Sequence, residues 1–168
     1  MSDPPKSLLL LLLLTLAAAA HVIHGTEGVT TPLATHFSVG GAPDGGVMSP
    51  SGYRWFAAGL WLLLVASFWT ARPIVLWVGP RWLNLPHRDA WIGQPRERTA
   101  AIVGAWLEGM GLLTLMFVMG VHESVFQANE VSPPQLNQPV FLAMLGGYFA
   151  VLLALMVRFF RRMRRPPA

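Results

Sequence analysis

The chain has 168 residues, of which 54% are hydrophobic and only 12% are charged, and it contains no cysteine. This composition is too apolar for an ordinary soluble domain and indicates a polytopic membrane protein. The formal net charge of +4 does not indicate a nucleic-acid partner, because the Lys and Arg residues lie in clusters beside hydrophobic segments. Without cysteine, neither disulfides nor thiolate metal sites can form.

Four hydrophobic segments follow one another along the sequence, and each predicts a membrane helix. The first, at about 8–24, is a run of Leu and Ala that acts either as an uncleaved anchor helix or as a signal peptide. The others lie at about 53–72, 99–126 and 139–161. Since about 20 apolar residues cross the hydrocarbon core of a bilayer, we expect an all-α fold. The expected architecture is a four-helix transmembrane bundle that forms a single polytopic domain over residues 1–168.

The end of the second segment is ambiguous. The apolar patch at 74–78 follows Arg72 and Pro73. It either extends the second helix past a proline kink or lies along the membrane interface.

The distribution of positive charge predicts the orientation of these helices. Arginines gather between residues 72 and 98 and again after residue 157, whereas 25–52 and 127–138 contain neither Lys nor Arg. Cytoplasmic loops carry the excess of positive charge in membrane proteins. We therefore expect both termini and the loop at 73–98 to be cytoplasmic, and the loops at 25–52 and 127–138 to be extracytoplasmic. The expected location is the cytoplasmic (inner) membrane of a bacterium, with the lipid bilayer as the first partner.

The loop at 25–52 has the composition of an ordered segment. Its glycines and the sequence Pro43–Asp44–Gly45–Gly46 are typical of turns, because Asp bonds nearby backbone and Gly allows positive φ. We expect a turn at 44–46, with His36 directed inward onto the helix ends. Ser or Gly within 49–52 is the expected N-cap of the second helix.

The segment PLATHFSVGGAPDGGVMS, residues 32–49, resembles the signature of a membrane domain of unknown function found at the N-terminus of SdpI-type immunity proteins. That signature has a Pro, a His followed by an aromatic residue, a Gly and an Asp-Gly turn ahead of a transmembrane helix. The matching positions here are Pro32, His36, Phe37, Gly41, Asp44 and Gly45. The resemblance implies a small multi-span protein with a short extracytoplasmic loop, and it implies no established chemistry. The immunity role belongs to longer relatives with additional spans.

A second stretch, NLPHRDAWIGQPRER at 84–98, is similar to the cytoplasmic segment of short, stand-alone members of that family. It departs from their pattern at Ala90, where an aromatic residue is usual, and at Gln94, just before Pro95.

Histidines gather on one side of the expected membrane. They lie at the outer ends of the first and third segments and in the loop between the first two, with a carboxylate beside one of them: His21, His24, His36, His122 and Glu123. Imidazoles with methionine thioethers suit copper, and imidazoles with a carboxylate suit zinc. A copper or zinc site is therefore one hypothesis. The alternative is that interfacial histidines hydrogen-bond the loop and that the methionines fill gaps between helices.

Glu108 lies within the apolar third segment, at a depth where an ionisable group is costly. Gly104 and Gly111 share its helical face, so we expect this face to meet another helix closely. We expect the carboxyl group to have a polar partner there, either Thr15, Ser67, Thr70 or a group of another subunit. Its role is then either a packing hydrogen bond, which we favour, or part of a proton or cation relay.

The sequence contains no phosphate-binding loop and no nucleophile elbow, so we do not expect an enzyme. The favoured hypothesis is a non-catalytic membrane protein, either an accessory or structural subunit or a small immunity- or sensor-like partner of other membrane proteins. Close helix contacts, within the chain or with a partner, are allowed by small residues spaced four apart, at 143 and 147 and at 146 and 150. The alternative hypothesis is a metal-handling or small-solute membrane protein that uses the histidine cluster.

Overall fold

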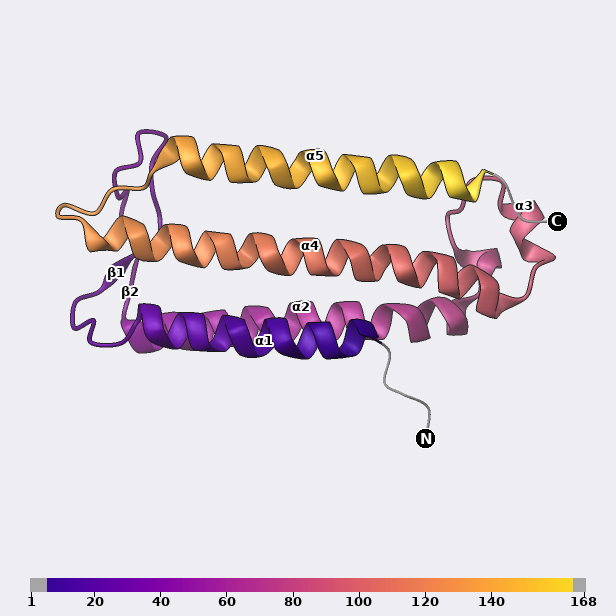
Figure 1. Ribbon diagram of the computed structural model, residues 1–168, viewed down its shortest axis with the longest axis horizontal. Coiled ribbons are helices and arrows are strands. Elements are labelled where there is room, and N and C mark those ends of the chain that lie inside the picture. The colour runs from indigo at the N-terminus through magenta and orange to yellow at the C-terminus, as the bar shows by residue number, and fades with distance from the viewer. Residues whose placement is uncertain (1–5, 165–168) are drawn as a thin grey trace.

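The computed structural model describes residues 6–164 and is mostly helical, in agreement with the all-α class predicted from the sequence. Four long helices run along the molecule (Figure 1): α1 (Lys6–Gly25), α2 (Pro50–Val78), α4 (Arg96–Glu130) and α5 (Gln138–Met163). One end carries a small hairpin of β1 (Leu33–Ala34) and β2 (Val47–Met48). The other end carries the 3-10 turn η1 (Pro80–Trp82) and the short helix α3 (Arg88–Ile92). We call these the hairpin end and the α3 end.

α4 is the central helix of this arrangement. α1 and α2 pack against it on one side, and α5 packs against it on the other (Figure 1). α5 therefore packs chiefly against α4, and the bundle is open rather than closed. One broad face of α5 is left without a neighbour among residues 6–164.

Three helices are long and apolar enough to cross a membrane: α2, α4 and α5. The apolar part of α1, Leu9–Gly25, is shorter. Helices of this length and composition are those of a multi-pass membrane protein. Their observed bounds extend beyond the expected segments, since α4 and α5 each begin earlier and end later than 99–126 and 139–161.

α2 begins at a side-chain cap and passes through a proline without ending. Ser49 is its N-cap, and the Ser49 Oγ accepts a hydrogen bond of 3.1 Å from the Gly52 N–H. The helix continues past Pro73 to Val78, so the patch at 74–78 extends α2 and does not form a separate interfacial segment. This settles the ambiguity in favour of the first interpretation.

The hairpin is pinned to the helix ends by its tip. β1 and β2 are antiparallel, and the hydrogen-bonded turn lies at 38–41, where the Gly41 N–H donates to the Ser38 carbonyl over 2.8 Å. The expected turn at 44–46 is instead a bend at Gly45, and the Asp44 N–H bonds back across the hairpin to the His36 carbonyl. Gly41 has a φ of +80°, and a side chain there would meet the Leu136 carbonyl oxygen. The sequence predicts a turn in this loop, but the reversal lies at 38–41, five to six residues before the expected 44–46.

Buried apolar side chains fill the contacts of α4 along its whole length, in three groups at the hairpin end, the middle and the α3 end. At the two glycines that share a face with Glu108, the neighbouring helix comes close, as expected. Gly111 lies against the Phe68 ring and Gly104 against the Arg72 side chain, both on α2.

Trp91 packs inside the α3 end of the molecule rather than at its surface. Its side chain is fully buried, and its indole Nε1–H donates to the Met163 carbonyl oxygen over 3.0 Å. Met163 is the last residue of α5, whose final carbonyl groups lack partners within the helix. Trp91 therefore fastens α3 to the end of α5.

Candidate functional site

His122 is a buried polar side chain at the hairpin end. It is 2% exposed and lies on the α2-facing side of α4. Both of its ring nitrogens meet side chains of α2. The Nδ1 atom lies 2.7 Å from the Tyr53 hydroxyl oxygen, and the Nε2 atom lies 3.4 Å from the Trp61 Nε1 atom. The Tyr53 and His122 rings meet edge to face with centroids 5.5 Å apart.

These partners fix the tautomer of the neutral imidazole. An indole nitrogen only donates, so the His122 Nε2 atom must accept from Trp61. The ring proton then lies on Nδ1, and the Nδ1–H donates to the Tyr53 oxygen. No lone pair of the ring is left free for a metal ion, and the network joins α2 to α4 through buried side chains.

His21 and Glu123 form a second polar contact at this end, between α1 and α4. The His21 Nε2 atom lies 3.4 Å from the Glu123 Oε2 atom, without the alignment of a hydrogen bond. The other Glu123 oxygen accepts a hydrogen bond from the Gln127 amide. Because imidazole carries charge only when protonated, this contact becomes an ion pair only with a protonated His21.

The five candidate metal ligands are not gathered at one point. His24 lies on the exposed side of α1, 3.8 Å from Glu27, and His36 is exposed on the hairpin rather than directed inward. Only His21 and Glu123 meet, while both nitrogens of His122 are occupied. Among residues 6–164, no three His, Cys, Asp or Glu side chains are placed to hold a metal ion. The sequence correctly put these residues at one end of the molecule, but sharing an end does not make them converge.

Asn129, near the end of α4, holds the hairpin, which carries the residues of the resemblance at 32–49. The Asn129 Oδ1 atom accepts from the Ala34 N–H over 2.8 Å, and its Nδ2 atom donates to the Ala34 carbonyl over 2.9 Å. A third hydrogen bond runs from Nδ2 to the Val125 carbonyl. Within these residues, His36 is exposed, and a side chain added at Gly46 would meet the His36 Cβ. Pro32, Asp44 and Gly45 are exposed, Phe37 pairs with Pro43, and Gly41 contacts the segment before α5.

Arg54 connects the start of α2 with the end of α1. Its Nε–H donates to the Thr26 Oγ1 atom over 2.7 Å, and its Nη2–H donates to the Thr26 carbonyl over 3.0 Å. Thr26 is 1% exposed, and its hydroxyl donates to the Val22 carbonyl. A cation at the carbonyl end of a helix also opposes the helix dipole favourably.

Glu108 is half-buried, and its carboxylate has no hydrogen bond or ion pair within the described chain. The three residues proposed as its partners bond elsewhere: Thr15, Ser67 and Thr70 each donate to a carbonyl one turn back in their own helix. The expected partner inside the chain is therefore wrong, because these hydroxyl groups find a nearer acceptor in their own backbone.

Sequence reasoning missed the residues that organise this end: Tyr53, Arg54, Trp61 and Asn129. Tyr53 lies near the start of α2, and its ring is buried against His122. One signal could have found Asn129, which lies seven residues after His122 and therefore on the same helical face.

No family model matches this chain, and no curated protein or solved structure matches it either. The function is therefore inferred from the chain's own residues and their arrangement.

Proposed function

We propose that this protein is a non-catalytic subunit or small partner, immunity- or sensor-like, of a larger assembly in a bacterial inner membrane. The observation that carries the proposal is the free face of α5, opposite to its contact with α4. Small residues follow one another on this face at spacings of four, three and four: Ala143, Gly147, Ala150 and Ala154. All four are exposed, and a side chain added at Gly147 would meet nothing within 4 Å.

Small residues in membrane helices allow two backbones to approach closely, and such stripes are enriched at helix–helix interfaces. Within this chain, α5 meets α4 through larger side chains of its other face. Tyr148 stacks on Phe117 with ring centroids 4.5 Å apart, and Phe159 stacks on Trp106 at 4.3 Å. The internal contact therefore leaves the small-residue face unused, which supports a role for it in binding another membrane helix.

Glu108 gives a second, independent support. A half-buried carboxylate in an apolar helix is expensive without a polar partner, and the described chain provides none. A polar group of another subunit would supply one. We regard this carboxylate as a contact group rather than as one member of a proton relay, since no second acid lies along the helices near it.

The orientation and family of the chain belong to the same proposal. We propose that the hairpin end is extracytoplasmic and that the α3 end, which carries nearly all the arginines, is in the cytoplasm. The likeness of residues 32–49 to the domain of SdpI-type immunity proteins supports a small multi-span protein of this kind. The alternative of a metal-handling protein has no comparable support, because the candidate ligands are separated within residues 6–164.

The test is to purify the tagged full chain from native membranes in a mild detergent, with two glycine variants. Gly147→Leu adds bulk to the free face of α5, and Gly59→Leu adds the same bulk at an exposed, open position on α2. Overpacking a contact costs about 1–3 kcal/mol, so Gly147→Leu should reduce the recovered complex by about tenfold. Gly59→Leu should leave it unchanged. A wild-type chain that is always recovered alone, or two variants that behave alike, would contradict the proposal.

A further inference from the structure

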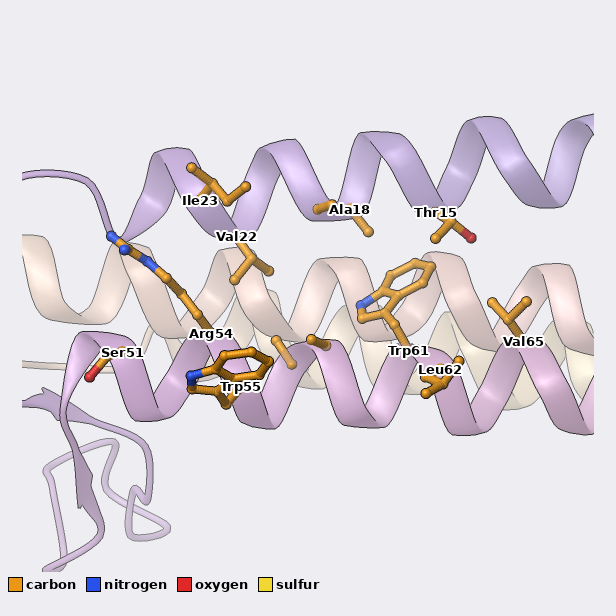
Figure 2. A pocket seen from close by; sticks show the side chains of 13 residues that line it. Thr15, Ala18, Val22, Ile23, Ser51, Arg54, Trp55, Trp61, Leu62 and Val65 are labelled. Atoms are coloured by element: carbon orange, nitrogen blue, oxygen red, sulfur yellow. The ribbon is translucent and has the colours of Figure 1, made fainter.

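A hollow of about 620 Å³ runs between α1 and α2 and opens on the side facing away from α4 (Figure 2). Alanines of both helices line it, at positions 18, 19, 57 and 58, and these short side chains leave the space open. Its remaining walls are mostly larger apolar side chains: Val22, Ile23, Trp55, Trp61, Leu62 and Val65. The hollow is therefore an apolar groove in the part of the molecule that lies at membrane depth.

The groove is long enough to cross the hydrocarbon layer of one leaflet. Along α2 it extends from Ser51 to Val65, which at 1.5 Å per residue is about 21 Å. Half of a hydrocarbon core of about 30 Å is about 15 Å. A single acyl chain of a lipid in the leaflet at the hairpin end could therefore lie along the groove for its whole depth.

Arg54 closes the groove at its hairpin end. Figure 2 shows its side chain reaching from α2 toward the end of α1, where Thr26 accepts two of its N–H groups. A guanidinium has five N–H groups, so three have no acceptor among residues 6–164. No carboxylate of the described chain lies within ion-pair distance of it.

Arg54 is also the one Lys or Arg at the hairpin end of residues 6–164, since the sequence has no other between Lys6 and Arg72 or between Arg98 and Arg158. Trp55 beside it is 80% exposed. Indole rings collect at the level of lipid headgroups, which places the hairpin end of the groove at that level. A fixed cation there, above an apolar trough, has the complementary pattern of an anionic amphiphile.

We propose that this groove binds one anionic phospholipid. Its phosphate would lie on the free N–H groups of Arg54, and one acyl chain would lie along the alanine-lined groove. Arginine suits this role because its planar fork can bond two phosphate oxygens at once. A helix of a second protein fits less well. A cylinder about 10 Å wide and 21 Å long occupies about 1,600 Å³, so only a row of its side chains could enter.

The site is independent of the free face of α5 and requires only that α1 and α2 lie in a bilayer. Thr26 holds Arg54 in place before any lipid arrives, so little side-chain freedom is lost on binding. The same contacts give Arg54 a structural role at the end of α1, and the experiment must separate the two roles.

The first measurement is native mass spectrometry of the full chain in detergent, titrated with phosphatidylglycerol or with zwitterionic phosphatidylcholine. We expect one retained phosphatidylglycerol and weaker retention of phosphatidylcholine. Arg54→Gln should weaken phosphatidylglycerol binding about tenfold, because charged hydrogen bonds to the phosphate are lost. Arg72→Gln removes a cation from the other end of α2 and should change it little. Inorganic phosphate should not displace the lipid, since the acyl chain contributes to binding.

A second variant keeps the proposal testable if Arg54→Gln fails to fold. Ala58→Phe fills the trough and leaves Arg54 intact, so it should also weaken phosphatidylglycerol binding, whereas Gly59→Leu next to it should not. In vesicles of phosphatidylcholine with phosphatidylglycerol, a photoreactive acyl chain should label residues 15–23 and 51–65. Equal retention of both lipids, unchanged binding in Arg54→Gln and Ala58→Phe, or cross-links from Ala58→Cys to another protein chain would overturn the proposal.

Discussion

The contacts of His122 leave its neutral ring a single arrangement, with the proton on Nδ1 and the lone pair on Nε2. The assignment follows from Trp61, which can only donate to the ring. Tyr53 must then accept at 2.7 Å, and a buried N–H group depends on that one oxygen. Burying such a donor without an acceptor costs more than an ordinary hydrogen bond contributes.

We therefore expect Tyr53→Phe to destabilise the protein by about 1–2 kcal/mol, through the unpaired Nδ1–H of His122. Tyr148→Phe is the matched control, since Tyr148 is the other of the two tyrosines in the chain. The Tyr148 hydroxyl bonds to the Thr114 hydroxyl, and Thr114 also donates to the Met110 carbonyl. That change should cost well under about 1 kcal/mol. Reversible unfolding in mixed micelles measures both. An equal loss in the two variants would show that the His122 network has no special weight.

Little of this network could be read from the sequence. His122 and Glu123 stood out as ionisable groups near a helix end, but Tyr53 and Trp61 are separated from His122 by more than sixty residues along the chain. Aromatic residues near a membrane helix end have an ordinary explanation as interface anchors. Only the packing of α2 on α4 decides which of them turn inward.

Asn129 shows how a short hairpin is kept in place by one side chain of another element. β1 and β2 have only two residues each, too few to be stable in water by themselves. Asn129 both accepts from and donates to the backbone of Ala34, and so substitutes for a neighbouring strand. A side chain that can only accept cannot reproduce this pattern.

Asn129→Asp should therefore release the hairpin from α4, because a carboxylate facing the carbonyl groups of Ala34 and Val125 loses two donors. The expected loss is about 1–3 kcal/mol of local stability. Hydrogen exchange should show faster exchange of the amides in 33–48. Asn137→Asp is the control, since Asn137 only accepts from the Val140 N–H at the start of α5. If both variants exchange alike, the clamp assigned to Asn129 is wrong.

At the level of elements, the four long helices follow from the apolar runs, since those runs are long enough to leave little choice. The sequence predicts an ordered loop with turns here, but it does not fix where the chain reverses, because Gly40–Gly41 and Asp44–Gly45 are both acceptable turn sequences. The docking of the tip decided between them, through the hydrogen bond from the Leu136 N–H to the Gly41 carbonyl. Such a contact depends on tertiary structure and leaves no local signal.

The molecule as a whole is asymmetric in charge along its length. The arginines of η1, α3 and the ends of α4 and α5 all lie at the α3 end, and among residues 6–164 Arg54 alone lies at the hairpin end. That exception has a local explanation in the contact with Thr26. The two loops at the hairpin end, 25–52 and 127–138, contain no Lys or Arg, which is the charge pattern expected if that end is extracytoplasmic.

Because the chain has no cysteine, single-cysteine variants can test this orientation without the removal of any native cysteine. Ala42 and Ser132 are exposed at the hairpin end, and Gln94 lies just before α4 at the α3 end. With the hairpin end outside, a membrane-impermeant thiol reagent should label Ala42→Cys and Ser132→Cys in intact cells. Gln94→Cys should react only after permeabilisation, since the bilayer separates it from the reagent. The opposite pattern would place the arginine-rich end outside, against the charge distribution. Labelling of Ala42→Cys without Ser132→Cys would mean that the segment after α4 lies on the opposite side of the membrane from the hairpin. The open bundle with both loops at one end would then be wrong.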